Sequence, residues 1–163
     1  MPSPTEGDIF AGSSYPTTKP TFWSRFHGFE DDPTVGLENV FKRLAIHQGW
    51  STKSKRHHRA EAFEAEFGNR LGTQSTLESW QKLCVIVGIQ PVPPSIKKCK
   101  KALKGKHVNI VNLINHCRNP DKFSLKKFAS YAEFQNYTKR GHIFPKAAAK
   151  RNAFLKELLR VIY

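Results

Sequence analysis

The stretch LENVFKRLAIHQGWSTKSKRHHRAEAFEAEFGNRL, residues 37–71, decides the fold. From Leu37 to Ala45, apolar side chains recur at the i, i+4, i+7 and i+8 spacing of a helix that buries one face. Gly49 supplies the left-handed residue that commonly ends a helix, and Trp50 can then fold back over the apolar face. The pattern predicts two helices joined by a short turn, with Trp50 at the joint.

The second helix of this stretch is predicted to start near Ser54 and to bury one stripe, made of Ala60, Phe63, Phe67 and Leu71. Its opening is crowded with basic side chains: Lys53, Lys55, Arg56, His57, His58 and Arg59. Cations at a helix N-terminus oppose the helix dipole, and each placement costs about 0.3–1 kcal/mol. A local preference broken several times in a row indicates function. Because a helix N-terminus ringed by cations favours an anion, a phosphate or another anion is the expected ligand.

The rest of the chain predicts further short helices separated by glycine and proline. Four side chains are expected to cap helix starts: Thr34, Ser75 (with Glu78 as a capping box), Ser95 and Ser124. Pro145 suits the first turn of the last helix. Residues 108–117 fit either a helix or a strand, and helix is favoured because no comparable partner strand is present. The predicted fold is an all-α, compact bundle of six or seven short helices. Residues 1–20 are predicted to be a flexible, disordered tail, and 21–163 a single helical domain.

An aromatic segment precedes the first helix and contains Phe22, Trp23, Phe26 and Phe29. So many large apolar groups are expected to pack onto the helical body and seal its core. The alternative is an exposed aromatic patch that docks a protein partner.

The charge of the chain is uneven. Two Lys or Arg oppose six Asp or Glu in residues 1–38, a net charge of −4, whereas 25 oppose seven in residues 39–163, a net charge of +18. Such an excess concerns partners rather than fold. Nucleic acid is the leading polyanion, followed by a membrane surface and an acidic protein.

A second basic cluster follows Ser95 and has lysines on the faces opposite its apolar stripe: Lys97, Lys98, Lys100, Lys101, Lys104 and Lys106. Lysine is a point charge that contacts phosphate rather than base edges. The two clusters together are the predicted nucleic-acid-binding residues, with DNA expected before RNA and with strongly salt-dependent binding. This hypothesis requires the clusters to gather on one side of the molecule. The alternatives are a solvated charged surface and a protein-interaction or scaffold domain without catalytic activity.

Motifs of catalysis and metal binding are missing from the sequence. It contains no GxxxxGK[ST], no GxGxxG after a strand, no HExxH and no GxSxG. Two groups hold possible metal ligands, His57 and His58 with Glu61 or Glu64, and Cys99, His107, His116 and Cys117, but neither has the spacing of a zinc module. The sequence therefore predicts no enzyme, metal or cofactor, although a Cys–His pair that meets only in space stays open.

Cysteine usage and hydropathy suggest the compartment. The three cysteines are odd in number and unevenly spaced, unlike a secreted disulfide framework. The first 20 residues lack the basic and apolar regions of a signal peptide, and no run of about 18 apolar residues is present. The expected location is nuclear or cytoplasmic, not secreted and not in a membrane.

Several sequence blocks, in this order, carry a resemblance: FWSRFHGFEDDPT (22–34), FKRLAIHQGW (41–50), LESWQKLC (77–84), KKCKKALKGKHVNIVNLI (97–114) and IFPKAAAKRNAFLKELLR (143–160). They resemble an uncharacterised family common in filamentous fungi, over roughly residues 22–162. The resemblance implies a fungal source and one structural unit, and it carries over no activity or site. The helix–turn–helix with a terminal Trp is also similar to Myb-like DNA-binding domains, whose regular tryptophan spacing is missing here.

Overall fold

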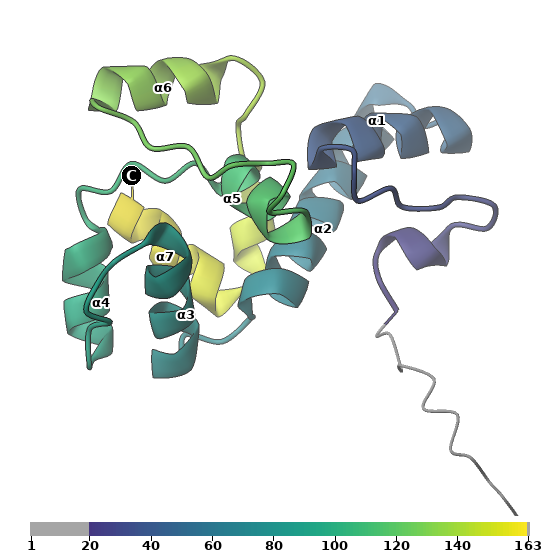
Figure 1. Ribbon diagram of the computed structural model, residues 1–163. Helices are drawn as coiled ribbons and strands as arrows, with labels where there is room; N and C mark the ends of the chain where they lie inside the picture. Colours follow the sequence, from purple (N-terminus) through teal and green to yellow (C-terminus); the bar gives the residue numbers. More distant parts are fainter. Residues whose placement is uncertain (1–19, 163) are drawn as a thin grey trace, which may run out of the picture.

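The longest helix, α2 (Thr52–Leu71), contacts α1, α3, α5 and η2 and forms the centre of the fold (Figure 1). The computed structural model describes residues 20–162. In chain order the other elements are the 3₁₀-helix η1 (Trp23–Arg25), α1 (Leu37–Gln48), α3 (Leu77–Val87), α4 (Ile96–Leu103), α5 (Ile110–Arg118), α6 (Tyr131–Lys139), the 3₁₀-helix η2 (Lys146–Lys150) and α7 (Ala153–Ile162). Seven α-helices and no strand within 20–162 confirm the predicted all-α class. The predicted tail over 1–20 falls, except for its last residue, outside the described part of the chain.

The core lies between the helices and draws on every one except α6, from which Phe134 is buried nearby. On α2 the buried stripe includes Phe63, Phe67 and Leu71, as predicted, whereas Ala60 is only partly buried and Ala62 lies inside. Within residues 20–162, no helix combines the length and apolar character needed to cross a bilayer.

The turn between α1 and α2 confirms the prediction made from residues 37–71. Gly49 has a φ of 62°, in the left-handed region, and the Trp50 N–H donates to the Ala45 carbonyl at 3.1 Å. The Trp50 indole then packs on Phe41, with ring centroids 5.9 Å apart. The helix α2 begins two residues before Ser54, because the Ser51 side chain caps it and accepts a hydrogen bond from the Ser54 N–H.

The aromatic segment packs onto the body, as its composition predicted. Phe22 and Trp23 are buried, and Phe26 and Phe29 are partly buried against the core. The Trp23 Nε1–H donates to Glu66 Oε1 at 2.6 Å, so this segment is bonded to α2 inside the protein.

Only one of the four predicted caps is confirmed, that of Ser95, which accepts from the Lys98 N–H. Thr34 does not cap α1, because its hydroxyl donates to Asp32. Ser75 and Glu78 form no capping box, because the Ser75 hydroxyl donates to Glu157. Thr76 caps α3 instead.

The prediction of a helix that starts at Ser124 is wrong. Asn112, on α5, donates to the Ser124 carbonyl and accepts from the Lys126 N–H. These two bonds hold the chain in a non-helical course, and α6 begins only at Tyr131, capped by Ser130. The last predicted helix is divided, because η2 follows Pro145 and a separate α7 begins after Asn152. The ambiguous segment 108–117 is confirmed as helical, as α5.

An amide from another helix supplies the missing cap of α1. Asn115 on α5 accepts a hydrogen bond from the Leu37 N–H at 2.8 Å. Asn115→Ala is expected to lower the free energy of unfolding by about 0.5–2 kcal/mol, the usual cost of losing an N-cap. Thermal unfolding followed by circular dichroism measures this loss. Asn115→Asp keeps an acceptor at this position and should lose less; equal losses would contradict the capping role.

Candidate nucleic-acid interface

The first predicted cluster lies on the opening turns of α2 and divides into exposed and engaged side chains. Lys53, Lys55, Arg56 and His57 are exposed. Arg59 is engaged: it makes two hydrogen bonds to the Glu38 carboxylate, at 3.1 and 2.8 Å, and one to the Ile143 carbonyl at 2.7 Å.

Two further contacts hold the start of α2. His58 stacks on Trp50, with ring centroids 4.0 Å apart, and its Nδ1 lies 3.3 Å from Glu61. Glu61 also accepts from Arg25, and these hydrogen bonds outweigh burial and lower the pKa of that carboxyl. The excess positive charge predicted at the start of α2 is therefore carried by the exposed side chains of the first cluster.

The second predicted cluster lies on α4 and the turn after it. Lys97, Lys98, Lys101, Lys104 and Lys106 are exposed. Lys100 is bonded to Glu157, with Nζ 2.8 Å from Oε2, and its Nζ also lies 5.2 Å from the Trp80 ring centre.

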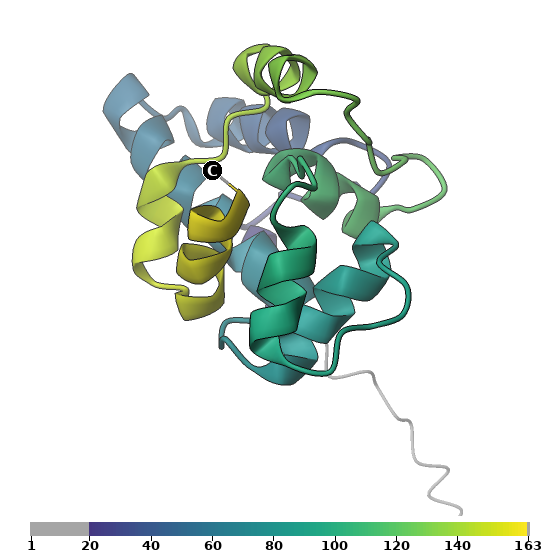
Figure 2. The same ribbon diagram turned by 90° about the vertical axis from the view of Figure 1, so that its left-hand side faces the viewer.

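The structure does not bring α4 and the first turns of α2 side by side. They lie at opposite ends of the molecule in Figure 1 and remain apart after the 90° turn of Figure 2. The requirement that the two clusters gather on one face is therefore not met by direct contact. Other basic residues lie between them, around three surface hollows.

The first hollow lies between α1 and the start of α2 and has a volume of about 780 Å³. Its basic residues are Lys42, Lys55, Arg56 and Arg59. Trp50 and Phe41 contribute an apolar lining. Half of the first cluster thus borders a concave surface together with one lysine of α1.

The central hollow, of about 530 Å³, lies between α1, α5, the segment before α6, and the end of α6. Four cations line it: Lys42, Lys122, Lys126 and Arg140. All four are exposed, and no ion pair engages them within residues 20–162. Tyr137 and His142 also line it, stacked with ring centroids 3.9 Å apart.

The third hollow is smaller, about 290 Å³, and lies beside the turn that follows α4. Lys106, Lys126 and Lys127 line it, with Phe128 and His107. Lys106 belongs to the second predicted cluster, so this hollow reaches the end of α4.

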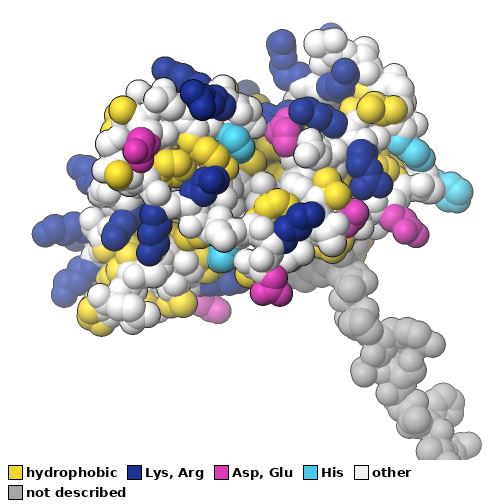
Figure 3. Space-filling model, turned by 45° about the horizontal axis from the view of Figure 1, so that its top comes forward, with side chains coloured by type: hydrophobic (Ala, Val, Ile, Leu, Met, Phe, Trp, Pro, Cys, Tyr) yellow, Lys and Arg dark blue, Asp and Glu magenta, His cyan; other side chains and the backbone are white. Residues whose placement is uncertain are grey.

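The three hollows are linked by shared lining residues. Lys42 and Glu38 line both the first and the central hollow, and Lys126 lines both the central and the third. We call the basic residues of this series the basic track: Lys42, Lys55, Arg56, Arg59, Lys106, Lys122, Lys126, Lys127 and Arg140. Figure 3 brings the upper side of the molecule forward, and on it Lys and Arg extend from one end to the other with fewer Asp and Glu between them.

Within the described residues, carboxylates compensate little of the positive charge of the basic track. Among the residues of 20–162 that line the three hollows, the one acidic side chain is Glu38, and its carboxylate is already bonded to Arg59. Uncompensated cations in concave surfaces focus the electrostatic field and concentrate anions.

Sequence reasoning missed five members of the basic track. Lys42, Lys122, Lys126, Lys127 and Arg140 belong to neither dense run, and only the fold brings them together. Lys126-Lys127 is a short basic pair, but the sequence alone did not show that it borders the same surface as α1.

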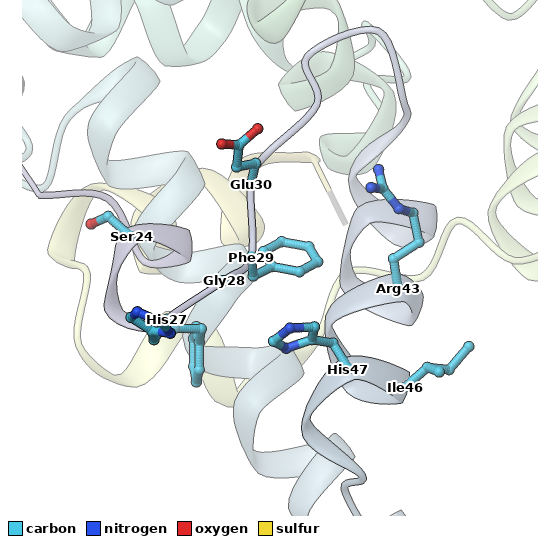
Figure 4. A pocket seen from close by; sticks show the side chains of 9 residues that line it. Ser24, His27, Gly28, Phe29, Glu30, Arg43, Ile46 and His47 are labelled. Carbon is cyan, nitrogen blue, oxygen red and sulfur yellow. The ribbon is translucent and has the colours of Figure 1, made fainter.

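A fourth hollow, shown in Figure 4, adjoins the first hollow at Ile46 of α1 but, within residues 20–162, has no basic residue of the track in its lining. The segment 26–30 and α1 form it, with His27, Glu30, Arg43 and His47 among its lining. The ring of His47 packs edge-on against Phe29, with centroids 5.8 Å apart. Within residues 20–162 no group of three or more His, Cys, Asp or Glu side chains has the arrangement of a metal site.

The cysteines are poorly placed for nucleophilic chemistry. Cys84 and Cys99 are buried, and burial together with the neighbouring Cys99 raises the pKa of the Cys84 thiol to about 12. Burial also raises the pKa of Cys117. Because the thiolate is the reactive form, thiols held protonated in a core are unreactive.

Comparison with known proteins gives no relative on which to base an assignment: no protein-family model, curated protein or solved structure matches this chain.

Proposed function

We propose that this protein is a nucleic-acid-binding module that contacts phosphates through the basic track. The observation that carries the proposal is the continuity of the three hollows, which within the described residues gather nine cations around one acid already bonded to Arg59. Phosphate contacts from Lys and Arg supply most of the non-specific affinity for nucleic acid. The track joins the exposed end of the first cluster to Lys106 of the second, so a strand lying along it contacts members of both.

The predicted alternative, a protein-interaction domain, relied on the aromatic segment Phe22–Phe29 or on an exposed part of the last helix. Phe22 and Trp23 are buried, and so are Phe154, Leu155, Leu158 and Ile162 of α7. Because these side chains lie in the core, they do not form a docking surface. The basic track therefore favours nucleic-acid binding over protein interaction. A nuclear location and a fungal family remain predictions that accompany this proposal.

Fluorescence anisotropy with a labelled 20-nucleotide oligonucleotide tests the function. Affinity should fall as salt rises, with a log–log slope of about 0.7 per phosphate contacted for a single strand and about 0.9 for a duplex. The triple variant Lys42→Ala/Lys126→Ala/Arg140→Ala should reduce this slope by about one for each contact removed.

A charge-matched control separates the track from overall net charge. The triple variant Lys146→Ala/Lys150→Ala/Lys156→Ala loses the same charge from exposed side chains that line none of the three track hollows. It should bind nearly as the wild type does. Absence of binding at low salt would refute the function, and equal losses in the two triple variants would refute the assignment to the track.

A further inference from the structure

The concave shape of the basic track favours one form of nucleic acid, duplex or single strand, over the other. A duplex is a convex rod that presents phosphates outside and stacks its bases inside, so its bases do not reach shallow hollows. A single strand has bases that splay out and stack on aromatic side chains beside a basic groove. The central hollow, of about 530 Å³, falls within the roughly 300–1,000 Å³ of small-ligand sites and suits a single nucleotide.

Aromatic rings line every hollow of the track. Trp50 lies in the first, Phe123 and Tyr137 in the central, and Phe128 in the third. In the central hollow Lys126 Nζ lies 5.3 Å from the Tyr137 ring centre, so a cation and a ring are adjacent there. Alternating cations and rings are typical of surfaces that bind single strands.

Polar groups without a partner border the same central hollow. Within the described residues, neither the Tyr137 hydroxyl nor the Asn115 amide nitrogen makes a hydrogen bond, while the Asn115 oxygen is engaged by the Leu37 N–H. The side-chain amide of Asn39, at the same rim, also makes no hydrogen bond within the described residues, whereas its backbone N–H donates to the Gly36 carbonyl. Amides and hydroxyls of this kind bond to the exposed edges of unpaired bases.

Resting on the proposed function, we infer that the basic track binds single-stranded nucleic acid, with one nucleotide seated in the central hollow beside Tyr137. The phosphates lie against Lys42, Lys126 and Arg140, and a base packs at the stacked pair of Tyr137 and His142, since His142 already covers one face of the Tyr137 ring. This orientation lets the strand continue toward Trp50 in one direction and Phe128 in the other.

The test compares a 20-nucleotide oligo(dT) with a 20-base-pair duplex at the same salt concentration. The single strand should bind at least about tenfold more tightly. Tryptophan fluorescence reports contact directly, because Trp23 and Trp80 are 1% and 0% exposed and Trp50 is the half-buried one. Oligo(dT) should therefore quench the Trp50 signal, and a variant carrying Trp50→Phe should lose the quenching.

Substitutions at Tyr137 test the central hollow. Tyr137→Leu should weaken oligo(dT) binding by about 5- to 150-fold, the range that one lost base stack gives. Tyr137→Phe keeps the ring and should bind within about threefold of the wild type. Melting curves check that both variants fold, and the strand preference and Trp50 quenching of the wild-type protein decide the question independently of them.

The outcomes separate this inference from the function on which it rests. Duplex binding as tight as oligo(dT) binding would overturn the inference and leave the proposed function intact, and it would favour docking of a duplex on the α1–α2 pair. Undiminished oligo(dT) binding by a folded Tyr137→Leu variant would overturn the role of the central hollow. Failure of both probes to bind at low salt would refute the proposed function itself.

Discussion

Replacing Arg118 with alanine is expected to lower the free energy of unfolding by about 3–5 kcal/mol, the usual cost of breaking a buried ion pair from one side. The Arg118 side chain is 0% exposed. It donates to both oxygens of Asp31, at 2.7 and 3.2 Å, and to the Asp32 carbonyl at 3.3 Å. Its Nη1 also lies 3.2 Å from Oε2 of Glu66, whose side chain is 4% exposed.

The cost is large because the partners of Arg118 stay behind. Glu66 accepts from Trp23 through Oε1, and its Oε2 has the charge contact with Arg118 but, among the described residues, no well-aligned hydrogen bond. Without the guanidinium, a carboxylate remains inside the protein with its main cation removed. The hydrogen bonds to Asp31 and the negative charges of Glu66 and Asp31 outweigh burial and raise the pKa of Arg118, so it is charged at neutral pH. Arg118 thus joins the segment before α1 to α2 and α5.

Urea unfolding at neutral pH measures the effect, and Arg70→Ala is the matched control. Arg70 approaches the same Glu66 oxygen, at 3.6 Å, from a side chain that is 37% exposed. Because the Arg70 guanidinium is partly exposed to water and its contact with Glu66 is long, the pair is expected to contribute only about 0–1 kcal/mol, so this variant should be close to the wild type. If Arg118→Ala lost no more stability than Arg70→Ala, the buried network would not be a main support of the fold.

The double variant Arg118→Met/Glu66→Met sharpens the test. Replacing both charges by apolar groups of similar size removes the stranded carboxylate, and such exchanges are often near neutral. The double variant should therefore be more stable than Arg118→Ala, although Trp23 loses its acceptor. A loss equal to the sum of the losses of Arg118→Met and Glu66→Met, each made alone, would indicate that the two side chains act independently.

Periodicity predicts helices well in this chain and their starts less well. Apolar spacing located α1, α2 and α3, and Gly49 and Gly88 end α1 and α3 in the left-handed conformation. The predicted helix starts were wrong where more than one residue could serve as the N-cap. Ser124 and Ser130 are both good caps by type, and the choice between them depends on Asn112, whose side chain engages the backbone near Ser124. Such a tertiary contact has no local signature.

The same limit applies to the candidate site. Dense runs such as residues 53–59 are visible in the sequence, but Lys42, Lys126 and Arg140 are dispersed and meet only at the central hollow. The sequence contains one indication of the buried ion-pair network around Arg118. Glu66 lies between Phe63 and Phe67 on α2, so a carboxylate falls at the edge of the buried stripe and requires an internal cation.

Trp80→Ala is the second large effect, with an expected loss of about 3–5 kcal/mol, because it removes a large side chain from a packed core and leaves a cavity. Trp80 is 0% exposed and meets Phe154 of α7 edge to face, with ring centroids 4.9 Å apart. Its Nε1–H donates to the Ser75 hydroxyl at 2.9 Å. The ring is therefore a main contact between α3 and α7, and chemical denaturation measures its contribution.

The variant Trp80→Phe distinguishes the contribution of ring packing from that of the hydrogen bond to Ser75. This variant keeps most of the apolar volume and loses the bond to Ser75, so it should cost about 1–2 kcal/mol. A loss as large as that of Trp80→Ala would contradict packing as the main contribution.

The ion pair beside Trp80 adds a pH dependence to the same comparison. Hydrogen bonds from Lys100 and then Ser75 lower the pKa of Glu157. The stability that this carboxylate contributes is therefore present above its unfolded-state pKa and is lost as pH falls through the lower folded-state value. Because Trp80→Ala frees Ser75 and removes the ring beside Lys100, the loss of stability between pH 5 and pH 3 should be smaller in that variant. An unchanged acid dependence would mean that Glu157 keeps its partners without the indole, and that the ring contributes through packing alone.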